Sequence, residues 1–145
     1  MLRRLTRAVV IAGGLAISGC ASVPMASPEA DAAAKTYKVD PTKANLYIYR
    51  NENFGAAIKM PVLVDNVLVG DTAAKTYIFK QIDPGPHVIT SKTENDATLN
   101  VDTKAGENYF VWQEVKMGAF AARSKLHVVD EATGKAGVAE CKLVR

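Results

Sequence analysis

Short runs of strand-forming residues, separated by turn residues, make up the chain from residue 44 onward. The runs are rich in valine, isoleucine and aromatic residues, and none has the length and period of an amphipathic helix. The pattern predicts an all-β fold, an antiparallel β-sandwich of about seven or eight short strands, with a partly open barrel as the alternative. The runs cover 46–49, 62–64, 67–69, 77–82, 87–92, 97–102, 108–115 and 125–129.

Three turns between these runs are marked by their residue types. Asp65-Asn66 is a pair that tolerates positive φ, so it predicts a two-residue hairpin. Asp83-Pro84-Gly85-Pro86 is a dense turn signal. The segment 104–107 is expected to join 97–102 and 108–115 as a second hairpin.

A polar stretch, 130–137, follows the last of these runs. Asp130 can begin a helical turn, but Gly134 and Gly137 are poor helix formers. We therefore expect one short helical turn there at most, followed by an apolar stretch over 138–144.

The N-terminus resembles a bacterial export signal. Arg3, Arg4 and Arg7 precede an apolar run, 8–17, which is too short to span a membrane permanently. The whole chain has 18 Lys and Arg residues against 15 Asp and Glu residues, so the chain is neutral once these three arginines are removed. The basic balance is therefore no sign of nucleic-acid binding.

The export signal ends in Ile17-Ser18-Gly19-Cys20, which resembles the lipobox of bacterial lipoproteins. The resemblance implies cleavage between Gly19 and Cys20, diacylglycerol on the Cys20 sulfur and acylation of the new amino terminus, so that the partner is a lipid bilayer. Ala21, where an aspartate would favour the inner membrane, implies the periplasmic face of the outer membrane, with the inner membrane as the alternative. An ordinary secretory signal with an incidental cysteine is the other interpretation.

Composition divides the chain into three parts. Residues 1–19 are the signal peptide, 20–43 the lipidated N-terminus with a flexible tether, and 44–145 the β-sandwich domain. The tether is assigned because 22–43 is rich in Ala, Ser, Pro, Asp and Lys and has few large apolar residues.

A set of strand and turn motifs follows in order along the folded part: Leu46-Tyr47-Ile48-Tyr49-Arg50, Val64-Asp65-Asn66-Val67, Gly70, Tyr77, Asp83-Pro84-Gly85-Pro86-His87 and Gly106-Glu107-Asn108-Tyr109-Phe110. With these motifs the folded part resembles a bacterial lipoprotein family known as domain of unknown function 2846, and it is also similar to small PEGA-type sandwiches of envelope proteins. The resemblance implies a fold and a compartment, and it implies no catalytic residues.

No residue pattern in the chain predicts catalysis, a metal or a cofactor. His87 and His127 are the only histidines and lack further ligands at suitable spacing. Ser91 and Ser124 are the only serines after residue 43, and neither lies in a nucleophile motif. Cys141 is expected to be a buried or edge-strand thiol, with an intermolecular disulfide as the alternative because a lipidated Cys20 leaves it no partner in its own chain.

The aromatic residues are the remaining candidates for a functional surface. Tyr47 and Tyr49 share one strand face, and Trp112 lies on another aromatic strand. A strand with apolar residues on both faces is covered on both sides or exposes a patch. Core packing is one interpretation, and a docking surface for an envelope protein, formed by Tyr47, Tyr49 and Trp112, is the other.

The sequence therefore predicts a membrane-anchored periplasmic lipoprotein with a non-catalytic binding or structural role. The first alternative is an accessory subunit of a multi-protein envelope assembly for secretion, pilus formation or transport. A small hydrolase that uses His87 or Cys141 is the weakest interpretation. The sequence does not specify the oligomeric state or the partner.

Overall fold

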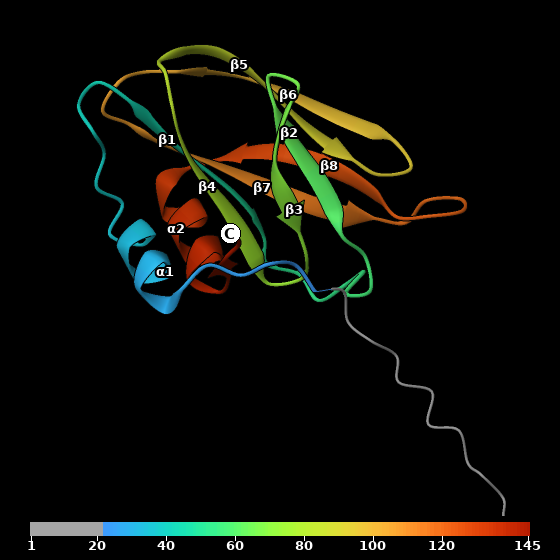
Figure 1. Ribbon diagram of the computed structural model, residues 1–145. Helices are drawn as coiled ribbons and strands as arrows, with labels where there is room; N and C mark the ends of the chain where they lie inside the picture. The colour runs from blue at the N-terminus through green and yellow to red at the C-terminus, as the bar shows by residue number, and fades with distance from the viewer. Residues whose placement is uncertain (1–21) are drawn as a thin grey trace, which may run out of the picture.

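The computed structural model describes residues 22–145 as two β-sheets and two short helices (Figure 1). The elements follow one another as α1 (Pro28–Ala34), β1 (Ala44–Arg50), β2 (Met60–Val64), β3 (Val67–Thr72), β4 (Thr76–Ile82), β5 (Gly85–Lys92), β6 (Asp96–Thr103), β7 (Asn108–Lys116), β8 (Arg123–Val129), α2 (Glu131–Ala139) and β9 (Lys142–Leu143).

The two sheets differ in how their strands pair. One has four strands in the order β3-β2-β5-β6, all antiparallel, and the other has five in the order β8-β7-β1-β4-β9. In the five-stranded sheet β1 pairs in parallel with β7, and β4 pairs in parallel with β9. The prediction of a mainly β fold is thus confirmed, but the fold is not purely antiparallel and not all-β.

The hairpin predicted at Asp65-Asn66 is present. Both residues have positive φ, 51° and 66°, which suits the two-residue turn whose twist matches that of the flanking strands. β2 and β3 pair antiparallel on either side of it, with Val64 opposite Val67.

The hairpin predicted around 104–107 is wrong. β6 pairs with β5, whereas β7 pairs with β1 and β8, so this turn carries the chain from one sheet to the other. The turn after β4 does the same, because β4 and β5 also lie in different sheets. Turn residues mark where a chain reverses, but they do not determine which strand the returning segment pairs with.

Aliphatic side chains fill the space between the two sheets. Alternate residues of β1, Leu46 and Ile48, point into it and are buried. We call this set the interior cluster. Its other buried members are Val23, Val62, Val64, Ala73, Ile78, Ile89, Val101, Val111, Leu126 and Val144.

A second cluster lies on the opposite face of the five-stranded sheet, beneath α1 and α2, which lie next to each other in Figure 1. The other residues of β1, Tyr47 and Tyr49, belong to it, and they too are buried. We call this set the aromatic cluster. Its other buried members are Ala34, Tyr77, Phe110, Val138, Cys141 and Leu143, and Tyr37, Phe79 and Trp112 pack against it.

Helix α2 is longer than the single turn expected from its glycines. It spans nine residues, and Asp130 caps it by accepting a hydrogen bond from the Thr133 amide at 2.8 Å. A Cβ at Gly134 would lie 2.1 Å from the Phe110 ring, and one at Gly137 would lie 2.2 Å from the Tyr49 ring. The glycines therefore let the helix approach the aromatic cluster closely, and that packing outweighs their low helix propensity.

The prediction of a flexible tether is wrong from residue 22 onward, and Cys20 and Ala21 lie outside the described residues. Met25 forms a β-bridge with Val144, and α1 begins at Pro28 after the N-cap Ser27. This segment consists mostly of small and polar residues, yet in the fold it covers tyrosines that are distant in sequence. Within 22–145, neither helix has the length and apolar character needed to cross a membrane.

Candidate functional site: an apolar end of the molecule

The predicted docking surface is not open in this structure. Tyr47 and Tyr49 are buried beneath the two helices, and the Tyr47 hydroxyl donates a 2.8 Å hydrogen bond to the Ala34 carbonyl of α1. The Tyr47 ring stacks on Phe110 at 5.0 Å. Core packing, the other interpretation of these residues, is therefore what the structure shows for both tyrosines.

Trp112 is half-buried at the margin of the same face. Its ring stacks on His127 at 5.0 Å, and His127 Nε2 lies 2.7 Å from Glu114 Oε2. The three residues come from neighbouring strands, since β7 pairs with β8 and places Trp112 opposite His127. Trp112 is thus more exposed to solvent than the two tyrosines, but its ring packs against neighbouring side chains at the margin of the sheet.

Ser91 and Ser124 meet inside the molecule although they lie in different sheets. The Ser124 hydroxyl donates to Ser91 Oγ at 2.8 Å, Gln113 Nε2 donates to the same oxygen at 2.6 Å, and Thr72 Oγ1 donates to Gln113 Oε1 at 2.5 Å. All four side chains are buried. They form a polar chain that joins the two sheets, because buried polar groups are stable only when they are hydrogen-bonded to one another.

His87 and Cys141 are likewise held in structural contacts. His87 Nδ1 lies 2.6 Å from Asp65 Oδ2, and Nε2 lies 2.7 Å from the Asp83 carbonyl oxygen, so the ring ties the β2–β3 turn to the start of β5. The buried Cys141 thiol donates to the Arg50 carbonyl, and burial raises its pKa to about 12. No group of three or more His, Cys, Asp or Glu side chains suited to a metal ion occurs within residues 22–145.

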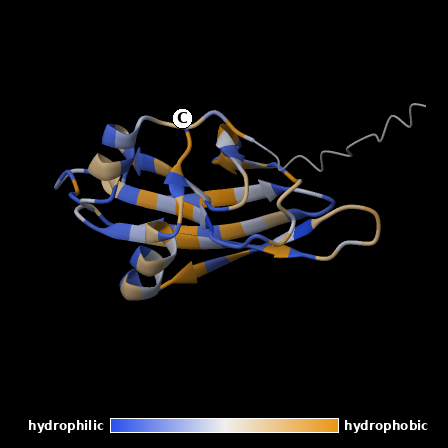
Figure 2. Ribbon diagram, turned by 90° about the horizontal axis from the view of Figure 1, so that it is seen from below, coloured by the Kyte–Doolittle hydropathy of each residue, from blue (hydrophilic) through white to orange (hydrophobic). Residues whose placement is uncertain are grey.

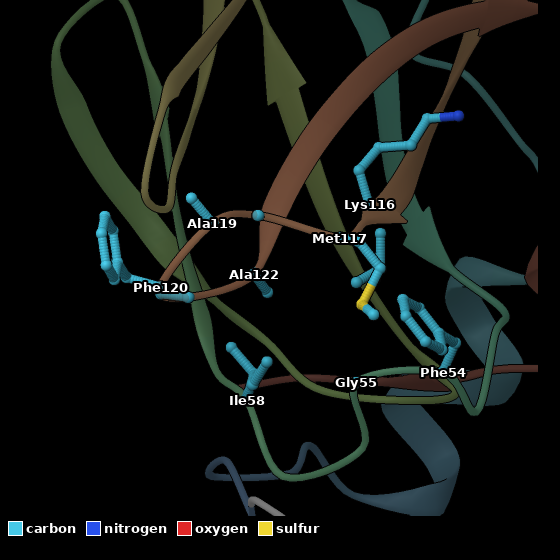
Figure 3. Close-up of a pocket in the computed structure, with 11 residues that line it drawn as sticks. Phe54, Gly55, Ile58, Lys116, Met117, Ala119, Phe120 and Ala122 are labelled. Atoms are coloured by element: carbon cyan, nitrogen blue, oxygen red, sulfur yellow. The ribbon is translucent and has the colours of Figure 1, made fainter.

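Large apolar side chains are exposed at one end of the molecule, where two loops lie side by side (Figure 3). The loops cover 51–59, between β1 and β2, and 117–122, between β7 and β8. Phe54 is 51% exposed, Met117 82% and Phe120 99%. We call the two loops together the apolar end.

The two loops enclose a shallow hollow of about 280 Å³. Met117 points toward Phe54 across it, whereas Phe120 points away from it into solvent (Figure 3). The rest of the lining is mostly small or aliphatic, and Lys116 is its one charged residue. An exposed apolar surface of this kind marks a place where a protein contacts another molecule or a membrane.

A buried arginine fixes the first loop. The Arg50 guanidinium donates to the carbonyls of Ile58 at 2.8 Å, Gly55 at 2.5 Å and Phe54 at 3.3 Å. Arg50 is fully buried at the end of β1, and these carbonyls offset the cost of burying its two terminal nitrogens, whereas Nε has no partner. The loop that presents Phe54 is therefore held in place from within the domain.

A carboxylate fixes the second loop. Glu94 Oε2 accepts hydrogen bonds from the amides of Ala121 at 3.2 Å and Phe120 at 3.4 Å, and these amides together with the nearby Arg123 lower the Glu94 pKa. A Cβ at Gly118 would lie 1.8 Å from the Ala121 carbonyl oxygen and 1.9 Å from Glu94 Oε2. The loop is thus folded tightly around the carboxylate and turns Phe120 outward.

Comparison with known proteins identifies the family. Residues 40–125 match the family described as "Protein of unknown function (DUF2846)". A protein of Haemophilus influenzae (strain ATCC 51907 / DSM 11121 / KW20 / Rd), described as "Uncharacterized protein", is 36% identical over 140 residues, which cover 94% of this chain and 83% of the relative. The chain belongs to the DUF2846 family. No solved structure matches it.

The matched region of the family includes both loops of the apolar end but ends before α2 and begins after α1. The similarity to the Haemophilus protein is longer and extends over most of the chain, so it is not confined to the two sheets. The DUF2846 resemblance found in the sequence is thereby confirmed.

The apolar end was missed by sequence reasoning. Its signal is the segment Met117-Gly118-Ala119-Phe120-Ala121-Ala122, which carries no charge although it connects two strands. Loops between strands are usually polar, so an uncharged connection with two large apolar residues is unusual. The first loop gives a weaker signal, because Phe54 and Ile58 in it are mixed with polar residues.

Proposed function

We propose that this DUF2846 protein is a lipid-anchored lipoprotein of the bacterial cell envelope, held at the periplasmic face of the outer membrane, with a binding or structural role. The lipobox-like segment Ile17-Ser18-Gly19-Cys20 supports the anchor. Cys20 and Gly19 lie outside the described residues, so attachment at Cys20 is a prediction from the sequence. Several acyl chains, at about 0.8 kcal/mol for each buried CH₂, would keep such a protein on a bilayer.

The position of Val23 carries this proposal further. Val23 is 8% exposed and belongs to the interior cluster, and the next residue, Pro24, accepts a 2.8 Å hydrogen bond from the Arg145 amide. Three residues span at most about 11 Å when fully extended. A lipid on Cys20 would therefore hold the folded domain directly against the membrane surface, and no long spacer would separate them.

A binding or structural role is supported by what the polar candidates do in the fold. Ser91 and Ser124 bridge the sheets, His87 ties two turns together, and the Cys141 thiol is buried. These four side chains, which were the candidates for nucleophile or base, are thus engaged in contacts that stabilise the domain. The exposed apolar end is better suited to contact with another surface.

Mass spectrometry of the mature N-terminal peptide from native membranes tests the anchor. We expect a peptide that begins at Cys20 and carries a diacylglyceryl group and an amide-linked acyl chain. Cys20→Ser should remain unprocessed and unmodified. A mature peptide that begins elsewhere without lipid contradicts the proposal.

Membrane fractionation tests the compartment, with a matched variant at the neighbouring position. We expect the native protein in the outer-membrane fraction and Ala21→Asp in the inner-membrane fraction. Crosslinking in intact envelopes then separates the two roles. One stoichiometric protein partner would favour an accessory subunit of an envelope assembly over an independent module.

A further inference from the structure

We propose that the apolar end is a membrane-contact surface, in which Phe54, Met117 and Phe120 enter the headgroup region of the bilayer that carries the lipid anchor. This inference rests on the proposed function, because it requires the domain to be held at a membrane. Beyond the anchor, it specifies how the domain is oriented on the membrane and which side chains determine that orientation.

The apolar side chains form one surface and are not scattered. Met117 and Phe120 lie in the same loop, and Phe54 lies across the hollow from Met117 (Figure 3). Together they comprise two aromatic rings and one flexible thioether, which fill irregular apolar surroundings well. Arg50 and Glu94 hold the loops in position, so the exposure of these side chains is built into the fold.

The charges around the apolar end suit a phospholipid surface. Lys59, Lys116 and Arg123 are exposed at the ends of the two loops. They match the nearby carboxylates Glu52, Glu94 and Glu114 in number, and Glu114 pairs with Lys116 at 2.6 Å while Glu94 lies 3.9 Å from Arg123, so this end carries no excess negative charge that would repel lipid phosphates. Apolar side chains bordered by basic residues are typical of protein surfaces that lie in a membrane interface.

The place where the described chain begins identifies the occupant as the bilayer. Its N-terminal end lies beside the loop 51–59 in Figure 1, and Figure 2 shows this end on the side of the molecule away from the two helices. β7 runs toward the same side before the loop 117–122. Cys20 is only two residues before the first described residue, Ser22. Acyl chains on Cys20 would therefore enter the bilayer within about 10 Å of this end, so the apolar side chains and the anchor reach the same surface.

The opposite end of the molecule provides a control. The turn 104–107 precedes β7 and the loop 117–122 follows it, and the nine residues of β7 separate them by about 30 Å. Ala105 and Ala119 are both exposed alanines, one in each of these segments. A label at Ala119 should contact lipid, and the same label at Ala105 should contact water.

The experiment uses the full-length lipidated protein, reconstituted in vesicles of phosphatidylethanolamine and phosphatidylglycerol. Ala119→Cys and Ala105→Cys are each labelled with an environment-sensitive fluorophore, and quenching by nitroxide-bearing lipids is measured on protein that floats with the vesicles. Cys141 is buried and Cys20 is expected to be acylated, so the unsubstituted protein should take up no label. We expect about threefold more quenching at position 119 than at 105, because an interfacial apolar surface enters the bilayer by only about 5–10 Å.

A second variant asks whether the apolar side chains cause the contact. Adding Met117→Ser and Phe120→Ser to the labelled Ala119→Cys protein should reduce its quenching to the level at 105 without releasing the protein from vesicles. Equal quenching at the two positions in floating protein would overturn this inference and leave the anchor intact. A protein that lacks acyl chains and does not float would overturn both proposals.

A different occupant would give a different result. If a second copy of the chain covers the apolar end, the label at 119 is shielded from aqueous iodide but not quenched by nitroxide lipids, and the shielding falls as the protein is diluted in the bilayer. That outcome also overturns the inference.

Discussion

The two faces of strand β1 are covered in different ways. Its interior face carries Leu46 and Ile48 and is covered by the other sheet, whereas its outer face carries Tyr47 and Tyr49 and is covered by α1 and α2. Every residue of β1 is buried. A central strand with apolar residues on both faces needs a cover on both faces, and this chain forms the second cover from its two ends.

The two faces of β1 also differ in whether their side chains need hydrogen-bond partners. The interior cluster is aliphatic and makes no hydrogen bonds through its side chains. The aromatic cluster contains tyrosines whose hydroxyls need partners, and Ala34 and Asp31 of α1 supply acceptors at 2.8 Å. α1 has only seven residues and would have little stability alone, so its contacts with the tyrosines help to hold it in place.

The largest expected effect is on the interior cluster. Ile48→Ala should lower the free energy of unfolding by about 2–5 kcal/mol, because Ile48 is fully buried and its neighbours in two sheets cannot close the cavity. Urea unfolding followed by circular dichroism measures it. Val128→Ala, which truncates an exposed residue of β8, is the control and should change stability by less than about 0.5 kcal/mol. A loss at Ile48 no greater than at Val128 would contradict this view of the core.

The next effect separates the outer cover from the sheets. The double variant Gly134→Ala and Gly137→Ala forces two methyl groups against Phe110 and Tyr49, and we expect a loss of about 1–3 kcal/mol from overpacking despite the better helix propensity of alanine. Hydrogen exchange should show α2 losing protection while β2 and β5 keep theirs. Ala136→Met, on the exposed side of α2, is the control and should leave α2 protected.

A smaller effect is expected where α1 is tied to the sheet. Asp31 accepts hydrogen bonds from the Tyr77 hydroxyl at 2.8 Å, the Leu143 amide at 3.0 Å and Lys35 Nζ at 2.9 Å. Asp31→Ala should cost about 1–2 kcal/mol and make 22–43 more susceptible to limited proteolysis. Glu29→Ala, an exposed acidic residue of the same helix, should do neither.

The Asp31 contact also predicts a dependence on acid. Burial alone would raise the pKa of Asp31, but the hydrogen bonds from Lys35, Tyr77 and Leu143 lower it below its ordinary value. The stabilisation is therefore present above the unfolded pKa of about 3.9 and is lost as the pH falls through the lower folded pKa. The difference in stability between the native protein and Asp31→Ala should shrink over that range, and a constant difference down to pH 2 would contradict the explanation.

The smallest effect has the opposite dependence on pH and lies in the four-stranded sheet. Burial alone would lower the pKa of His87, but its contacts with the Asp65 carboxylate and the Asp83 carbonyl raise it above the ordinary value. Its stabilisation is present below the unfolded pKa of about 6.5 and is lost as the pH rises through the higher folded pKa. His87→Gln should remove this pH dependence of the free energy of unfolding. We expect the whole contribution to be under about 1 kcal/mol because Asp65 is exposed.

The matched control is the other histidine. His127→Gln should keep the slope that His87 produces above pH 6.5, since it leaves the contact between His87 and Asp65 intact. Thermal unfolding between pH 5 and 9 gives the pH dependence of stability for the native protein, His87→Gln and His127→Gln. An unchanged slope in His87→Gln would show that this ring does not cause the pH dependence.

Local signals in the sequence predicted part of this structure well. Asp65-Asn66 specified its hairpin because both residues accept positive φ, and the alternation of strand formers located most strands of the two sheets. The turn at 104–107 was also located, and the connection predicted over 83–86 exists but is shorter, since β5 begins at Gly85. The change of sheet that each connection makes was not foreseen. The apolar end was not foreseen, because Phe54 and Phe120 are 66 positions apart and only the fold brings their loops together.

By itself, the sequence determined the mainly β character and the positions of most turns, because these depend on the conformational preferences of neighbouring residues. It also determined the family, because the characteristic motifs can be recognised without the fold. Only the tertiary structure decided that β1 pairs in parallel with β7, that 22–43 covers Tyr47, and that Gly134 and Gly137 lie inside a helix. Each of these depends on contacts between residues distant in sequence. Packing against Phe110 and Tyr49 overrides the local preference of the glycines, and the same kind of long-range contact turns a composition typical of a tether into a cover.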